Sequence, residues 1–174
     1  LSLLRAPGTA PGDTLVPVRG VAARSATLRG MGLSRVGHAK WGILDGGFAK
    51  WTAEGRPVRS GRESRPLAVF RAAFNRQMHA TLDEVARRRT DGRTRLVDAR
   101  APERFEGRTE TIDKAAGHIP GALNVPHTEA ERWLRTQALP RDRDVVVYCE
   151  TGRRSTIVQQ MLVDPEGLND WVME

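Results

Sequence analysis

The chain has a single cysteine, Cys149, in the stretch DVVVYCETGRRS (residues 144–155), after a β-branched run and before a loop with a glycine and two arginines. A thiolate is the nucleophilic form of cysteine, and nearby cations and backbone N–H groups at the start of a helix stabilise it. Gly152 allows the backbone to curl so that several N–H groups point inward, and Arg153 and Arg154 add positive charge. This spacing predicts a nucleophilic Cys149 in a loop that holds an anion, which is the thiolate itself, a persulfide or an oxyanion brought to it.

A structural role is the alternative for Cys149, because a lone cysteine is more often a small buried apolar residue than a nucleophile. A core cysteine, however, needs neither the loop glycine nor the two arginines that follow it. One cysteine can form no intramolecular disulfide and no multi-cysteine zinc site, and we expect no metal and no cofactor.

Strands that alternate with helices must position this loop. Residues 145–148 are a continuous apolar run that suits a strand buried on both faces, and residues 155–163 carry apolar side chains at helical spacing. Upstream, residues 95–100 (RLVDAR) predict a strand that ends at Asp98, and residues 117–126 (GHIPGALNVP) predict a turn into another buried strand. The carboxyl ends of such strands gather the loops that bind ligands, and Cys149 lies at one of them.

Two further helices complete the pattern. One begins after Thr81, which has the spacing of a capping box with Glu84, and the other covers residues 127–139. We therefore predict the α/β class, with a central parallel sheet flanked by helices on both faces.

An internal repeat links the two ends of the chain. Residues 15–41 align without a gap on residues 145–171, and Arg19 stands at the position of Cys149. The identical pairs are Val16 and Val146, Arg24 and Arg154, Ser25 and Ser155, Met31 and Met161, Gly37 and Gly167, and Trp41 and Trp171. The repeat predicts a duplicated scaffold in which only the second copy carries the nucleophile.

Composition divides the chain into three predicted parts. Residues 1–58 form an incomplete, non-catalytic copy, and residues 80–174 form a nearly whole α/β domain. Residues 59–79 form a linker, because they begin with a stretch rich in glycine, proline, serine and charge.

The formal net charge is +7, but only three of the 28 basic residues are lysines, and the arginines are spread along the chain. No basic face with interleaved aromatic residues is visible, so we expect no nucleic acid partner. No apolar run approaches the roughly 18 residues that cross a bilayer, so we expect no membrane partner. The single cysteine suits a reducing cytoplasm, the location we expect, and the sequence does not predict the oligomeric state.

Four motifs, in their order and spacing, resemble the rhodaneses, particularly the tandem-domain thiosulfate and 3-mercaptopyruvate sulfurtransferases. They are ILDGGFAKWTAEGRPV (43–58), LVDARAPERFEG (96–107), GHIPGALNVP (117–126) and VVVYCETGRRS (145–155). The likeness extends over nearly the whole chain from about residue 13. It implies two rhodanese-like domains, of which the first is incomplete and inactive.

The resemblance also implies a double-displacement mechanism and roles for individual residues. The Cys149 thiolate would take a sulfane sulfur from a small anionic donor, thiosulfate or 3-mercaptopyruvate, and pass it from a persulfide to cyanide or a thiol. Arg104 would bind the donor, and His118 would hold its turn by hydrogen bonds rather than act as a base. The site would be organised by Asp98, Arg100 and Ser155, and the substrate-binding loop would consist of Glu150, Thr151, Gly152, Arg153 and Arg154.

Glu150 departs from the family pattern, since thiosulfate-using relatives tend to have a basic residue there and mercaptopyruvate-using relatives a glycine. Its carboxylate would repel an anionic donor, while Arg153 and Arg154 offset this repulsion and favour thiosulfate. Two other functions stay open, a non-catalytic rhodanese-like binding or regulatory module and a cysteine-based phosphatase or arsenate reductase. The latter uses the spacing Cys-x5-Arg, whereas the sixth residue after Cys149 is Ser155.

Overall fold

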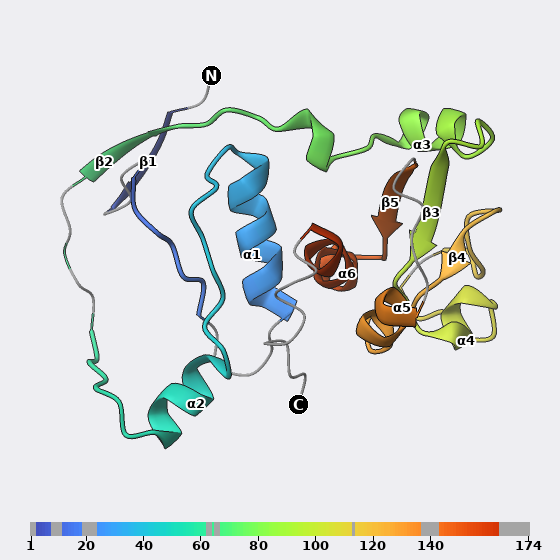
Figure 1. The fold of residues 1–174 in the computed structure, drawn as a ribbon. Coiled ribbons are helices and arrows are strands. Elements are labelled where there is room, and N and C mark those ends of the chain that lie inside the picture. Colours follow the sequence, from blue (N-terminus) through green and yellow to red (C-terminus); the bar gives the residue numbers. More distant parts are fainter. Residues whose placement is uncertain are drawn as a thin grey trace. The chain divides into compact units, whose positions relative to one another are not determined.

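The computed structural model describes residues 3–7, 12–18, 24–61, 64, 67–112, 114–136 and 143–163. It divides into two compact units, Leu1–His79 and Ala80–Glu174, and each is described by itself (Figure 1). Arg19 and the end of the predicted repeat, residues 164–171, lie outside the described residues.

A parallel sheet stands at the centre of the second unit. Its described strands are β3 (Thr94–Asp98), β4 (Leu123–Asn124) and β5 (Asp144–Tyr148), in the order β4-β3-β5. β3 pairs with β5 along its whole length, so that Asp98 lies opposite Tyr148, and β4 pairs with the last two residues of β3. The residues that follow β3 and β5 therefore leave the sheet at the same edge, and Cys149 is the first residue after β5.

The helices that the structure describes in this unit are α3 (Leu82–Arg88), α4 (Pro102–Phe105), α5 (Ala130–Thr136) and α6 (Arg153–Val163). α6 packs against both β5 and α5. Burial of a Val or Ile side chain contributes roughly 1.5–3 kcal/mol, so this core holds the start of α6 against the sheet. The core residues are Val97, Ala99, Val125, Ala130, Ile157, Val158 and Met161.

The first unit contains β1 (Leu3–Pro7), α1 (Arg24–Arg35), α2 (Gly47–Ala53), β2 (Leu67–Arg71) and the 3-10 helix η1 (Arg76–Met78). β1 and β2 pair antiparallel, and an isolated parallel bridge joins Leu15 to Trp41. The order of an extended residue at Leu15 followed by α1 is the same as the order of β5 followed by α6.

The α/β class and the parallel sheet are confirmed, and so is the capping box of α3. The Glu84 N–H donates to Thr81 Oγ1 at 3.3 Å, and the Thr81 N–H donates to the Glu84 carboxylate at 2.7 Å. The helix expected over 127–139 begins only at Ala130, because the Glu129 N–H turns back to the Pro126 carbonyl at 2.8 Å.

The interval 59–79 differs from the expected linker. It contains β2, which pairs with β1, and η1, whose first turn is capped by the Asn75 side chain. The apolar run LAVF (67–70) has the composition of a strand. It was not predicted as one because the linker was assigned from the polar stretch that precedes it.

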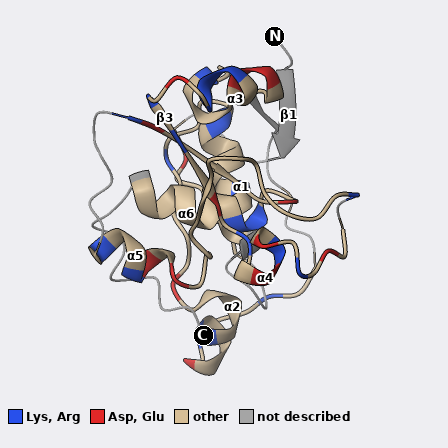
Figure 2. Ribbon diagram, turned by 90° about the vertical axis from the view of Figure 1, so that its right-hand side faces the viewer, with Lys and Arg blue, Asp and Glu red and all other residues tan. Residues whose placement is uncertain are grey.

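Charged residues of both signs lie together on α3 and α5 (Figure 2). On α5, Arg135 pairs with Glu131 at 3.0 Å, one turn earlier in the helix. Within the described part of the chain, no helix is long and apolar enough to cross a membrane.

Candidate active site

Cys149 lies between the end of β5 and the start of α6, and its sulfur contacts the first turn of that helix. The backbone N–H of Ser155 donates to Cys149 Sγ at 3.5 Å, and the thiol donates to the Ser155 hydroxyl oxygen at the same distance. The first N–H groups of a helix have no partner within it, so the sulfur occupies an acceptor position that the helix itself leaves open. Gly152 has φ 78°, the left-handed conformation that the sharp loop requires.

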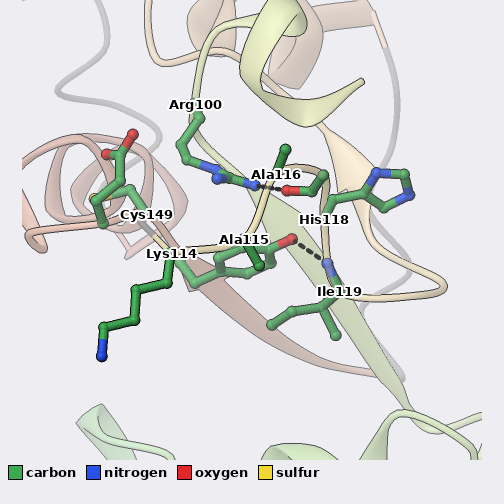
Figure 3. Close-up of a pocket in the computed structure, with 10 residues that line it drawn as sticks. Arg100, Lys114, Ala115, Ala116, His118, Ile119 and Cys149 are labelled. Carbon is green, nitrogen blue, oxygen red and sulfur yellow. Dashed lines mark hydrogen bonds between the residues drawn. The ribbon is translucent and has the colours of Figure 1, made fainter. Parts of the chain in front are cut away.

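A cavity of about 510 Å³ opens beside Cys149 (Figure 3). Three segments line it: the end of β3, the loop before β4, and the end of β5. The lining residues are Arg100, Lys114, Ala115, Ala116, Gly117, His118, Ile119, Tyr148, Cys149 and Glu150. The thiol is therefore half-buried at the edge of a space that can admit a small molecule.

Asp98 and Arg100 form a buried ion pair at the edge of the cavity. The Asp98 side chain is fully buried, and its Oδ2 accepts from Arg100 Nη2 at 2.7 Å. The same Nη2 atom donates to the Gly117 carbonyl at 2.7 Å, which fixes the loop before β4 (Figure 3). The hydrogen bonds that the Arg100 guanidinium donates to the Asp98 carboxylate raise the pKa of Arg100 above its ordinary value, so this group keeps its charge. The pair thus connects the end of β3 to the loop before β4, while its organising role in catalysis stays a prediction.

Glu150 is paired with two arginines from different helices. Its side chain is 1% exposed, and its carboxylate forms ion pairs with Arg104 of α4 and, at 2.8 Å, with Arg154 of α6. Arg104 also pairs with Glu110, which lies 3.7 Å from the Arg100 guanidinium. We call these four residues and the Asp98–Arg100 pair the ion network.

Tyr148 fixes the loop before β4 from the other side. Its hydroxyl accepts a hydrogen bond from the Ile119 N–H at 3.1 Å, and its ring lies under the Arg100 guanidinium, 5.9 Å from the ring centre (Figure 3). Burial raises the pKa of Tyr148 to about 12, so the phenol is neutral at physiological pH.

His118 holds the turn at the cavity mouth. Its ring stacks on Phe105 with centroids 3.7 Å apart, and Nδ1 lies 2.7 Å from the Phe105 carbonyl. Gly107, two residues after Phe105, has φ 77°, and a Cβ at Gly107 would lie 3.2 Å from the backbone nitrogen of Gly117. The expectation that His118 has a structural role in its turn agrees with these contacts.

The predicted site residues fall into two groups. Cys149, Glu150 and Arg100 line the cavity, and Ser155 contacts the sulfur from behind. The described lining does not include the remaining predicted residues, which are Asp98, Arg104, Thr151, Gly152, Arg153 and Arg154.

Sequence reasoning missed other residues of the lining. The sequence pattern assigns Tyr148 only to the end of a strand and gives Lys114 no role. The motif GHIPGA directly follows the segment 114–116, and this adjacency was the available signal.

No group of three or more His, Cys, Asp or Glu side chains within the described ranges is arranged to hold a metal ion.

The rhodanese-like domain model matches residues 81–173, which is more than half of the chain and includes all of the site described above. The chain belongs to the rhodanese family. The resemblance to this family, drawn from sequence, is thereby confirmed, and three of the four motifs lie within the matched residues.

Curated relatives of this rhodanese are named as sulfurtransferases. The chain is 32% identical over 141 residues to a putative thiosulfate sulfurtransferase of Mycobacterium bovis, which covers 69% of this chain and 50% of the relative. It is 40% identical over 94 residues to the thiosulfate sulfurtransferase of Rattus norvegicus, which covers 52% of this chain and 31% of that relative. The chain thus spans half or less of the length of these two relatives.

Among solved structures, the rhodanese fold is shared with SseA from Escherichia coli, described as a 3-mercaptopyruvate sulfotransferase. The two superpose with a TM-score of 0.74 and 26% identity over 94% of this chain and 65% of SseA. A probable thiosulfate sulfurtransferase matches with a TM-score of 0.62 and 25% identity, over 82% of this chain and 59% of that one. Both matches cover more of the chain than the second unit alone.

Proposed function

We propose that this rhodanese is a sulfurtransferase that moves a sulfane sulfur from thiosulfate or 3-mercaptopyruvate to a thiophilic acceptor through a persulfide on Cys149. One observation carries the proposal. The Cys149 sulfur borders the cavity and accepts a hydrogen bond from the Ser155 N–H at the start of α6. A thiolate and a persulfide anion are both stabilised in such a place.

With thiosulfate, the Cys149 thiolate attacks the outer sulfur of the donor. A bond forms between Sγ and that sulfur, the sulfur–sulfur bond of thiosulfate breaks, and its electron pair leaves with sulfite. With 3-mercaptopyruvate, the carbon–sulfur bond breaks instead, and the thiol proton of the donor ends on the carbon of pyruvate. Both routes leave the same persulfide anion on Cys149.

The second half of the reaction returns the enzyme to its starting state. Cyanide or a thiolate attacks the outer sulfur of the persulfide, and the electron pair of the broken bond returns to Cys149 Sγ. Ser155, whose N–H and hydroxyl both contact Sγ, stays in place as the negative charge moves between the two sulfurs. In this proposal Thr151, Gly152 and Arg153 belong to the loop that surrounds the transferred sulfur.

The decisive experiment is intact mass spectrometry of the chain after incubation with thiosulfate. We expect a gain of one sulfur atom, its loss on addition of cyanide with release of thiocyanate, and neither event in the Cys149→Ser variant. The same assay with 3-mercaptopyruvate compares the two donors. A wild-type chain that never gains sulfur from either donor, or a Cys149→Ser variant that transfers sulfur as well as the wild type, contradicts the proposal.

A second candidate is a non-catalytic rhodanese-like binding module. The pairing of Glu150 with Arg104 and Arg154 favours it, because a carboxylate already occupies guanidinium groups that would otherwise attract an anionic donor. A chain that gains no sulfur but changes the accessibility of Cys149 in the presence of a partner protein would support this candidate.

A further inference from the structure

Three arginines around the cavity, Arg100, Arg104 and Arg154, are already neutralised by buried carboxylates. The ion network contains three guanidinium groups and three carboxylates, and each arginine lies within ion-pair distance of at least one of them. The carboxylates Asp98, Glu110 and Glu150 are 0%, 9% and 1% exposed. The network as a whole therefore has no net charge with which to hold an anion in the cavity.

Lys114 differs from these arginines in position and in pairing. It lines the cavity together with Cys149, and its side chain is exposed and extended (Figure 3). Within the described ranges, Lys114 makes no ion pair. An ammonium on a flexible four-carbon stem can follow a small anion into the cavity, whereas the arginines are held by their carboxylates.

We propose that Lys114 binds the anionic group of the sulfur donor and places its sulfur in front of Cys149. This inference rests on the proposed function and deepens it, because it names the residue that holds the donor's charge. In the thiosulfate reaction negative charge gathers on the departing sulfite, and an ammonium beside it stabilises that charge. The arginines of the network, each paired with a buried carboxylate, keep the loops in place.

The first test measures the charge selectivity of Cys149 without any sulfur transfer. Iodoacetate and iodoacetamide alkylate a thiolate in the same way and differ mainly in charge. The ratio of the two rates does not depend on the fraction of thiolate, so it reports the attraction of an anion to the cavity. We expect this ratio to fall about tenfold in Lys114→Met and to keep most of its wild-type value in Lys114→Arg.

The second test measures the rate of persulfide formation on Cys149 at increasing thiosulfate concentrations by rapid quench and intact mass. Lys114→Met should raise the half-saturating thiosulfate concentration about tenfold, and added salt should weaken the wild type more than the variant. Lys50→Met is the matched control, because Lys50 belongs to the first unit and pairs there with Asp45. We expect it to change neither measurement.

The two tests separate this inference from the proposed function. If the wild type gains sulfur but Lys114→Met keeps the wild-type alkylation ratio and thiosulfate dependence, Lys114 is not the donor's anion contact and the inference is overturned. If Lys114→Met loses the alkylation preference while the wild type never gains sulfur, the anion site holds and the sulfurtransferase proposal fails.

Discussion

Ion pairs in the two units differ in how far they are removed from water. In the first unit, Lys50 pairs with Asp45 and Arg56 pairs with Glu54, and these side chains are between 39% and 54% exposed. The second unit has exposed pairs of the same kind, such as Arg88 with Asp144. It also has the ion network, whose carboxylates are almost wholly buried. The two units share an order of extended segment and helix, but the described residues of the first contain no buried network.

The second unit keeps buried charges although their burial costs free energy. Exposed pairs contribute little to stability, because water solvates both partners when they separate. Buried charges lose their hydration, and their attraction only partly repays that loss. A buried network with two members, Arg100 and Glu150, in the cavity that Cys149 lines is therefore better explained by the site it holds in place than by a gain in stability. Residues 1–79 contain no cysteine, and the predicted repeat aligns Arg19 with Cys149.

The largest expected effect comes from breaking the network at Arg104. Arg104→Gln leaves the buried carboxylates of Glu110 and Glu150 without a shared cation, and we expect a loss of about 3–5 kcal/mol in the free energy of unfolding. Urea denaturation followed by circular dichroism measures this loss. Lys50→Gln, which breaks an exposed pair of the first unit, should leave the unfolding curve unchanged.

A double variant tests whether Arg104 acts through Glu150. If Arg104 serves to neutralise the buried carboxylate, Arg104→Gln/Glu150→Gln should recover a large part of the lost stability and of the donor affinity. If instead Arg104 binds the donor directly, as the family resemblance implies, the double variant regains stability but not affinity. Strictly additive losses would mean that the two residues do not interact, contrary to the structure.

A second, smaller effect concerns Tyr148, the only tyrosine of the chain. Its pKa is raised from 10.0 to about 12 by burial, so the folded state favours the neutral phenol. The stabilisation is complete below pH 10 and is lost as the pH rises through 12, because the unfolded chain then releases its proton more readily. Tyrosinate absorbance should therefore rise with a midpoint near pH 12, and near 10 in urea. Tyr148→Phe should lessen the fall of stability between these pH values, and equal slopes in both proteins would contradict the expectation.

Much of the second unit was predictable because its signals are local. The valine run of β5, the helical spacing in α6 and the capping-box spacing of Thr81 and Glu84 each lie within a few neighbouring residues. Cys149 was placed correctly at the end of β5 for the same reason. Such signals depend on side-chain size, periodicity and hydrogen-bonding capacity, which can be taken directly from sequence.

The charge arrangement of the site was not predictable, because it depends on contacts between distant parts of the chain. Glu150 was expected to repel a donor, and the structure pairs it with Arg104 of α4. Arg153 was expected to offset Glu150, yet its side chain is exposed, while Arg154 forms the pair. In a chain with arginines throughout, sequence alone does not show which of them a buried carboxylate will meet.

The smallest effect is expected at the exposed capping box of α3, which contrasts with the buried network in the same unit. The Thr81 N–H bond to Glu84 lowers the pKa of that carboxyl, so its contribution is present above pH 4.5 and is lost as the pH falls through the lowered value. Thr81→Ala removes the side-chain half of the box and should cost about 1 kcal/mol at pH 7, measured by urea denaturation. Thr81→Ser keeps the hydroxyl and should retain most of the stability. We expect the smaller loss because water can replace the lost hydrogen bond at Thr81 but not the lost ion pair at Glu150. A loss of stability from Thr81→Ala as large as that from Arg104→Gln would contradict this difference between exposed and buried interactions.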